Sequence, residues 1–254
     1  MADNRFFSTL LRVEEVDSTN RYLLEEAHRL PDRTVLIARR QTKGRGRRGR
    51  EWETEPGALT FSVLFRALPP HRLTTLPLLA GLCGAEGIAR LTDCSPRLKW
   101  PNDLLVMGKK AGGILCESRS GTDGTLSAVC GMGINLTADA EWFADRKLPQ
   151  ATSLLAEGYP MEGDALLAGI EEAFARRYES FLQEGFASFA PEYRTFCDTV
   201  GQPIFILDGT SSRREGTALG ISEDGGLICR IGDREEVLHS GEVSVRPRDI
   251  CSDF

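Results

Sequence analysis

The 254-residue sequence predicts a mixed α/β domain over residues 1–198 and a small all-β domain over residues 199–254. Two observations carry this prediction. Before residue 198, short apolar runs rich in β-branched and aromatic residues alternate with segments whose apolar residues recur at helical spacing. After Val200, five short apolar runs are separated by turns such as "EDGG" and "GD". A meander of this kind is typical of a small SH3-like barrel.

Local patterns predict the elements of the first domain. Ser18 or Thr19 can accept hydrogen bonds from the free amides at the start of a helix, so a helix is expected over "DSTNRYLLEEAHRL". Apolar spacing predicts further helices over 74–91, 164–184 and 189–197. Strands are expected in the apolar runs at 34–38, 58–65, 97–100, 103–107, 111–118 and 126–135, with a hairpin tip at "MGKK".

Composition excludes several classes of protein. No run of 18 apolar residues occurs, so no membrane span is expected. The acidic N-terminus lacks the charge pattern of a signal peptide, which favours a cytoplasmic protein. The seven cysteines are scattered without a C-x-x-C pair, which argues against a disulfide framework and a zinc site. No G-x-S-x-G, H-E-x-x-H or P-loop motif is present, so hydrolytic triads and metal hydrolysis are not expected.

Positive charge is concentrated around "QTKGRGRRGREW", residues 41–52. Seven basic residues and no acidic one lie between Arg39 and Arg50, whereas the remainder carries 24 basic against 37 acidic side chains. Three interpretations compete: a solvated surface loop, a nucleic-acid-binding arm, and a cradle for a small phosphorylated ligand. Binding to a nucleic-acid backbone calls for a broad positive face. A short basic patch in an acidic chain therefore favours a compact anion, held by arginine donors and by glycine amides that can approach closely.

Two further segments favour the ligand interpretation. In "KWPNDLL" (99–105), Pro101 forces Trp100 into an extended conformation, and Asn102 and Asp103 are expected to form a tight turn before a new strand. In "GKKAGGILCES" (108–118), Lys110 directly precedes Ala-Gly-Gly and an apolar strand, so its side chain could reach inward from the sheet edge. Lys109 is expected to face solvent.

These segments belong to an ordered set that resembles the motifs of biotin protein ligases. The set comprises "DSTN" (17–20), "QTKGRGRRGREW" (41–52), "KWPNDLL" (99–105), "KKAGGIL" (109–115), "GMGINL" (131–136) and "ATSL" (151–154). Each motif is weak alone, but six in the same order cover most of the chain. The resemblance implies a mixed-sheet, class II synthetase-like catalytic domain followed by an SH3-like β domain.

The resemblance also implies a two-step reaction. Biotin reacts with ATP to give biotinyl-5′-AMP and pyrophosphate, and a lysine of a biotin carboxyl carrier protein then accepts biotin and releases AMP. Magnesium is expected with ATP, and family analogy suggests a homodimer through an exposed sheet edge. About sixteen residues precede "DSTN", too few for the DNA-binding domain of many relatives, so no DNA partner is expected.

The motifs assign site residues by resemblance. Lys110 is expected to contact both reacting groups, with Arg45 and Arg47 as further catalytic cations, because a carboxylate and a triphosphate repel each other. The expected biotin contacts are Ser18, Thr19, Asn20, Gln41, Arg45, Gly46, Arg47, Lys110 and Gly112. The expected ATP contacts are Trp52, Lys99, Asn102, Asn135, Trp142 and Arg246. Asp103 is the expected metal ligand.

Two alternatives remain open. A lipoate ligase would perform an analogous adenylation, and an RNA-binding protein would use the Arg-Gly segment alone with a steep salt dependence. The charge concentrated between Arg39 and Arg50 adds a conformational expectation for residues 41–52. Seven like charges with few apolar neighbours are expected to stay mobile until an adenylate gives the arginines a partner, and then to close over it.

Overall fold

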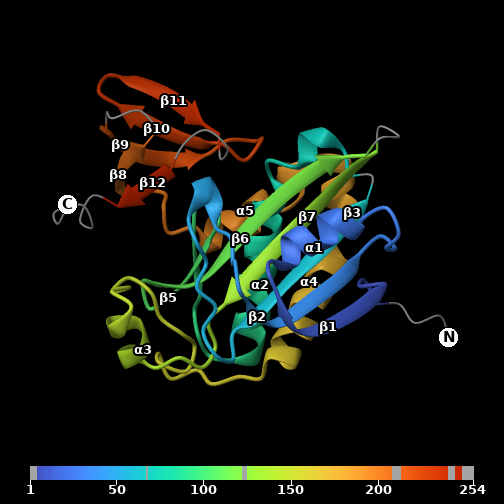
Figure 1. Cartoon of the computed structure of the whole chain (residues 1–254). Helices are drawn as coiled ribbons and strands as arrows, with labels where there is room; N and C mark the ends of the chain where they lie inside the picture. The colour runs from blue at the N-terminus through green and yellow to red at the C-terminus, as the bar shows by residue number, and fades with distance from the viewer. Residues whose placement is uncertain (1–4, 67, 122–124, 208–212, 240–243, 248–254) are drawn as a thin grey trace.

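The computed structural model of the chain describes residues 5–66, 68–121, 125–207, 213–239 and 244–247, the last four as backbone only. A seven-stranded mixed sheet carries helices on both faces, and a separate five-stranded antiparallel sheet follows it (Figure 1). In the part of the chain that is described, no helix has both the length and the apolar character needed to cross a bilayer.

The large sheet has the strand order β1-β2-β3-β7-β6-β5-β4, and only the β1–β2 pair is parallel. Its strands are β1 (Thr9–Val16), β2 (Thr34–Gln41), β3 (Leu59–Arg66), β4 (Arg97–Lys99), β5 (Asp103–Val106), β6 (Lys109–Ser120) and β7 (Leu126–Ile134). The sequence predicted six of them and missed β1. This strand is an edge strand with charged residues at three of its four exposed positions, so its apolar signal is weak.

The two faces of the sheet are covered unequally. On one face, α2 (Leu76–Leu91) lies between the sheet and α4 (Gly163–Glu184), which explains why α2 is apolar nearly all round. The helices approach closely at Gly87, where a Cβ atom would lie 3.0 Å from Ile170 Cγ1. On the other face, the short helix α1 (Thr19–Glu26) covers only one end, packing against Leu36, Leu64 and Val129. The remainder of that face is available for a site.

The shorter helices complete the first part of the chain. The α-helices are α3 (Ala140–Asp145) and α5 (Ala190–Phe196), and the 3-10 turns are η1 (Arg47–Gly49), η2 (Pro70–Arg72) and η3 (Gly185–Ser188). Helix α3 had no predicted counterpart; Asp139 caps its start, where the Asp139 side chain accepts a hydrogen bond from the Trp142 amide.

Two tight hairpins bring the "KWPND" and "KKAGG" segments to the same sheet edge. In the first, Trp100, Pro101 and Asn102 connect β4 to β5, with a cis Trp100–Pro101 peptide. Asp103 is the first residue of β5. The expectation that it forms part of the turn is therefore wrong. In the second, Met107 and Gly108 adopt φ angles of 50° and 77°, the pattern of a two-residue hairpin turn.

The C-terminal sheet has the order β11-β10-β9-β8-β12. Its strands are β8 (Pro203–Leu207), β9 (Arg213–Ile221), β10 (Leu227–Ile231), β11 (Arg234–Leu238) and β12 (Ser244–Pro247). The expected closed barrel is wrong for the described strands, because β11 and β12 are the two unpaired edges of an open sheet. The buried Trp100 Nε1 donates to Gly225 O at 3.0 Å and ties this sheet to the first domain. The boundary at residue 198 stays a prediction.

A fully buried carboxylate joins the segment after residues 41–52, here called the basic loop, to the end of β7. Glu55 has 0% exposure, and its side chain accepts hydrogen bonds from the amides of Leu136 and Thr137 at 2.7 and 2.9 Å. The Thr137 hydroxyl donates to the other oxygen at 3.1 Å. These bonds fix the loop that carries Trp52 relative to the segment that follows β7 and begins with Asn135.

We predict that Glu55→Ala lowers the free energy of unfolding by about 3 kcal/mol, because two buried amides and a hydroxyl lose their acceptor. Chemical denaturation measures this change. Glu53 supplies the control from the same segment, since its ion pair with Arg146 leaves the carboxylate 57% exposed. Glu53→Ala is expected to cost less than about 1 kcal/mol. Equal losses in the two variants would contradict the assigned role of Glu55.

Candidate active site

A cavity of about 580 Å³ opens on the face of the large sheet that α1 leaves uncovered. Side chains alternate between the faces of a strand, so the residues at 113, 115 and 117 of β6 and at 129, 131 and 133 of β7 face the same way. Val129 packs under α1, whereas Gly131 and Gly133 line the cavity. The cavity therefore lies next to α1 on the same face of the sheet.

Glycines make room for larger side chains on the cavity floor. A Cβ atom at Gly131 would collide with Asn20 Oδ1, and one at Gly133 would lie 2.5 Å from the Trp52 ring. The Trp52 Nε1 atom is buried and has no hydrogen-bond partner among the described residues. The indole thus lies against the bare sheet and leaves one donor to be satisfied by a ligand.

Polar groups gather at the end of the cavity next to α1. Ser18 caps this helix, and its hydroxyl accepts from the Arg21 amide. The Thr19 amide and hydroxyl both donate to Gln41 Oε1, at 2.8 and 3.0 Å. The buried Ser62 hydroxyl lies 2.7 Å from both Thr19 Oγ1 and Asn20 Oδ1. Sequence reasoning missed Ser62, since a serine inside the apolar run of β3 gives no local signal.

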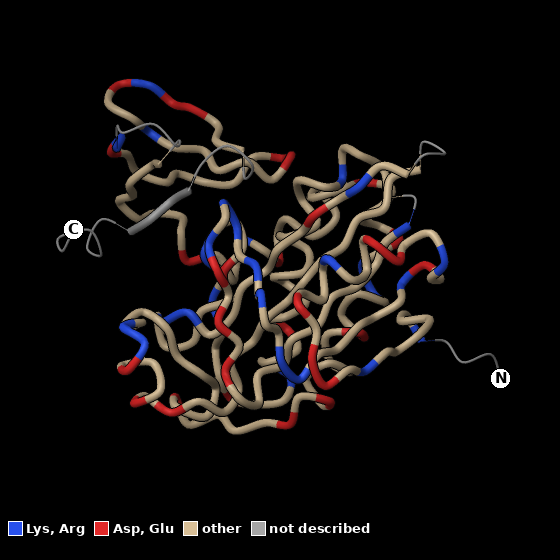
Figure 2. Tube along the Cα trace, in the orientation of Figure 1, with Lys and Arg blue, Asp and Glu red and all other residues tan. Residues whose placement is uncertain are grey.

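The basic loop lies over this floor, and its tip reaches the C-terminal sheet (Figure 1). Figure 2 shows the basic residues following one another along it. Three of its arginines have partners in the protein body: Arg45 Nη2 lies 3.0 Å from Glu117 Oε1, Arg47 donates to Asn102 Oδ1 at 3.0 Å, and Arg48 donates to Leu207 O at 2.7 Å. The expectation that the arginines lack partners without a ligand is therefore wrong for these three.

The backbone of the basic loop turns sharply at its tip, where a glycine is favoured. Arg48 and Gly49 adopt positive φ angles of 58° and 75° and turn the chain sharply at the tip.

Burial lowers the pKa of Arg47, the Asp103 charge opposes this effect, and repulsion from Arg48 and Arg50 adds to it. An arginine pKa starts so high that Arg47 keeps its charge at neutral pH. Arg47 is thus a partly desolvated cation beside the cavity, where its attraction for an anion is strengthened.

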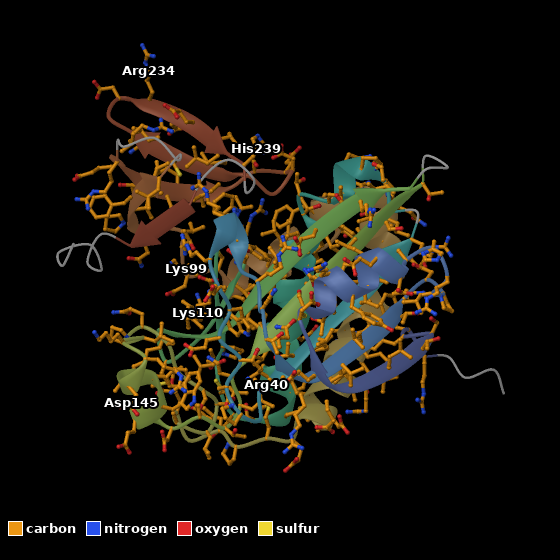
Figure 3. All side chains as sticks on the ribbon, in the orientation of Figure 1. Arg40, Lys99, Lys110, Asp145, Arg234 and His239 are labelled. Atoms are coloured by element: carbon orange, nitrogen blue, oxygen red, sulfur yellow. The ribbon has the colours of Figure 1, made fainter. Side chains whose placement is uncertain are left out.

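Lys110 faces the cavity, whereas Lys109 faces away from it. The Lys110 ammonium lies 2.7 Å from Asp103 Oδ1 and 5.7 Å from the centre of the Trp52 ring. Figure 3 shows Lys110 close to Lys99, between the C-terminal sheet and the α3 segment. Lys109 is exposed and pairs with Glu157 at 3.1 Å, as expected for a solvent-facing lysine.

A second cavity of about 1060 Å³ adjoins the first and shares Gln41, Arg45, Trp52 and Lys110 with it. Asn135 and Trp142 line this second cavity only. The Asn135 amide donates to Thr152 O at 2.9 Å, so it holds the neighbouring segment in place. The Arg146 guanidinium lies 4.0 Å over the Trp142 ring.

Most of the predicted site residues meet at these two cavities, with two exceptions. The first cavity brings together Ser18, Thr19, Asn20, Gln41, Arg45, Gly46, Arg47, Trp52, Lys99, Asn102, Asp103 and Lys110. Gly112 does not line it, because a Cβ atom there would face Leu104 and Ile134; the neighbouring Gly113 takes that place. The side chain of Arg246 lies outside the described residues, so its role stays a prediction.

The carboxylates near the cavity do not form a preformed metal cage. Within the described ranges, no three His, Cys, Asp or Glu side chains come together as metal ligands. One oxygen of Asp103 is already paired with Lys110. Magnesium commonly keeps several waters and binds through one or two carboxylates and substrate phosphates. The residues therefore fit an ion that arrives with a phosphorylated ligand, with Asp103 as a candidate protein ligand.

The combined features specify the chemistry that this site can accommodate. Hydroxyl and amide groups at one end suit a neutral polar ring, and the glycine and indole surface suits an apolar chain. Lys110, Arg45 and Arg47 then suit a carboxylate or a phosphate. Because Lys110 and Trp52 border both cavities, a ligand in one cavity could react with a ligand in the other at the Lys110 ammonium.

Comparisons with known proteins agree with this geometry. Residues 13–135 match the Biotin/lipoate A/B protein ligase family, and residues 199–246 match the Biotin protein ligase C terminal domain. The biotin–[acetyl-CoA-carboxylase] ligase of Paracoccus denitrificans is 32% identical over 233 residues, which cover 89% of this chain and 96% of that protein.

Two further relatives extend the comparison. The bifunctional ligase/repressor BirA of Escherichia coli is 30% identical over 239 residues, which cover 91% of this chain and 72% of that protein. The structure of the Aquifex aeolicus biotin protein ligase in complex with biotin and ATP aligns with a TM-score of 0.79 and 30% identity, covering 95% of this chain and all of that one. The sequence motifs, the fold and the relatives agree, and the chain belongs to the biotin protein ligase family.

Proposed function

We propose that this chain activates biotin with ATP and transfers the biotinyl group to a lysine of a biotin carboxyl carrier protein. The observation that carries the proposal is the position of Lys110 at the border of two adjoining cavities, only one of which is lined by the polar side chains of Thr19 and Asn20. Biotin in the first cavity would direct its carboxylate toward Lys110. ATP in the second would present its α-phosphate to the same ammonium.

The first step joins two anions. A carboxylate oxygen of biotin forms a bond to the α-phosphorus, and the bond to the pyrophosphate oxygen breaks. Lys110 and Arg47 would stabilise the negative charge that shifts between these oxygens, and Arg45 would hold the carboxylate end. Ser18, Thr19, Asn20 and Gln41 would match the donors and acceptors of the ureido ring, since an unmatched buried group costs about 1–3 kcal/mol.

The second step consumes the mixed anhydride. The neutral amine of the carrier lysine attacks the biotinyl carbonyl, AMP departs with the bonding electrons, and the amine loses one proton. We propose Trp52, Asn135 and Trp142 as nucleotide contacts in the second cavity, and Lys99 and Asn102 as contacts for the part of the nucleotide that extends into the first. Magnesium bound with ATP would neutralise phosphate charge, and the oxygen of Asp103 that faces away from Lys110 would be its protein ligand.

Three attributes of the chain complete the proposal. We propose a cytoplasmic location, because the reaction needs ATP and the N-terminus lacks the charge pattern of a signal peptide. The acidic balance of the chain favours no sequence-specific DNA partner, and the edge strand β1 would allow a homodimer by pairing with a second copy. Gel shifts with DNA and sedimentation of the protein test the last two attributes.

A lipoate ligase and an RNA-binding protein are the competing functions. Biotin-dependent exchange of pyrophosphate into ATP separates all three, because it requires adenylation of biotin specifically. The biotin ligase proposal predicts exchange with biotin and none with lipoate. Exchange with lipoate alone would favour the first competitor. No exchange, together with salt-sensitive RNA binding, would favour the second.

We predict that Lys110→Ala folds normally but lowers biotin-dependent pyrophosphate exchange by about 1,000-fold, because one cation serves both reacting groups. Circular dichroism checks the fold. The adjacent Lys109→Ala is the matched control and should change the exchange rate by less than about twofold, since that side chain pairs outside the cavity. Normal exchange by Lys110→Ala would remove Lys110 from the proposed role.

We also predict that biotin plus ATP slows tryptic cleavage between Lys43 and Arg50 by at least about fivefold, because the adenylate would add partners to a loop held by a few side-chain contacts. Cleavage after the exposed Arg119 provides the internal control and should not slow. Equal cleavage rates with and without the adenylate would show that the loop does not close over it.

A further inference from the structure

The carboxylate of Glu117 lies beneath the polar end of the cavity and contacts two expected biotin-binding residues. Its Oε2 atom accepts a hydrogen bond from Asn20 Nδ2 at 2.9 Å, and its Oε1 atom lies 3.0 Å from Arg45 Nη2. The Glu117 side chain is only 20% exposed. None of the six sequence motifs includes it, so its position calls for a separate explanation.

Glu117 helps to fix the direction in which the Asn20 amide points. Asn20 is 4% exposed, and its nitrogen also donates to Leu115 O at 3.0 Å. Both neighbours of the nitrogen are acceptors without a proton, so an amide turned by 180° would place oxygen against two oxygens. The two acceptors beside the Asn20 nitrogen therefore keep the amide oxygen pointing toward Ser62.

The direction of this amide decides the donor pattern of the next two residues. Asn20 Oδ1 can only accept, so the single proton of the Ser62 hydroxyl points toward it at 2.7 Å. The Ser62 oxygen then offers its lone pairs to Thr19, 2.7 Å away. The Thr19 hydroxyl becomes the adjustable member, able to donate to Ser62, to Gln41 or to a ligand.

We propose that Glu117 is a positioning residue that sets the donor and acceptor pattern of the biotin ring site through Asn20 and Ser62. This inference rests on the proposed function. A ureido ring presents two N–H donors and one carbonyl acceptor, so recognition depends on which protein groups donate and which accept. The negative charge of Glu117 makes one pattern strongly favoured before biotin enters, and its ion pair draws Arg45 toward the same ring site.

Two substitutions at position 117 separate the hydrogen bond from the charge. Both Glu117→Gln and Glu117→Leu remove the ion pair with Arg45, and both side chains have nearly the volume of glutamate. Only glutamine keeps an acceptor for Asn20. Titration calorimetry with biotin and without ATP measures the dissociation constant of each variant in the absence of turnover, and thermal unfolding reports any loss of stability.

The proposal predicts unequal effects. Glu117→Gln should raise the dissociation constant for biotin by about 5-fold, and Glu117→Leu by about 50-fold, because only the leucine variant releases the Asn20 amide. Equal dissociation constants in the two variants would overturn the proposal and leave Glu117 with the ion pair to Arg45 alone. Arg45→Ala, which removes that pair from the other side, provides the reference value.

A rescue experiment tests the pathway itself. Asn20→Asp places a carboxylate against Glu117 and should weaken biotin binding by about 100-fold. Adding Glu117→Gln restores a donor–acceptor pair between the two positions and should recover at least about tenfold of that loss. A double variant as weak as Asn20→Asp, or weaker, would contradict the proposed link. Failure of the wild-type chain to bind biotin would instead contradict the proposed function.

Discussion

Mutual repulsion among the arginines of the 41–52 segment is the constraint around which the site is organised. Repulsion between cations placed this close raises the free energy of the folded chain unless each cation has an acceptor. The acceptors come from three separate elements: Glu117 on β6, Asn102 in the β4–β5 turn and Leu207 on the C-terminal sheet. The conformation of the basic loop therefore depends on its contacts with the large sheet, the β4–β5 hairpin and the C-terminal sheet.

The same constraint explains why carboxylates lie beside two of the cations that face the cavity, Lys110 and Arg45. Asp103 neutralises Lys110 and Glu117 neutralises Arg45, so positive charge is kept in place without a bound anion. A carboxylate held by the fold costs no ordering entropy when a ligand arrives, and its charge is balanced again once the ligand shares the cation. The protein thus exchanges internal counter-ions for the charges of its substrates, and removing either acid would take the counter-ion from a partly exposed cation.

Sequence reasoning predicted many residues that line the two cavities, but it missed two polar residues beneath them. Ser18, Gln41, Arg47 and Lys110 were predictable because each belongs to a short motif whose glycines, caps or charges act locally. Ser62 and Glu117 were not, since a polar residue on an apolar strand gains its meaning only from the strand and helix that face it. The choice between Gly112 and Gly113 also required structure, because the ladder between β5 and β6 shifts register at Leu104 and Leu105 and reverses the facing of the residues beyond it.

The fold shows the same division between local and distant causes. Helices α2 and α4 and the central strands were predicted from apolar spacing, whereas β1 was missed because half of its residues are polar and its pairing with β2 is a distant, parallel contact. Closure of the C-terminal sheet into a barrel was expected and does not occur between the described strands. Strand number can be read from turn signals, but closure depends on a pairing between the first and last edges that no local pattern encodes.

The indole of Trp52 forms a partition, since it borders both cavities while its nitrogen has no partner among the described residues. A ligand on either side that reorients this ring changes the wall seen by a ligand on the other. The two binding equilibria are then linked through one side chain, and linkage is reciprocal. Whatever factor the first ligand contributes to the affinity of the second, the second returns to the first, so the order in which the substrates enter changes the path and not the final free energy.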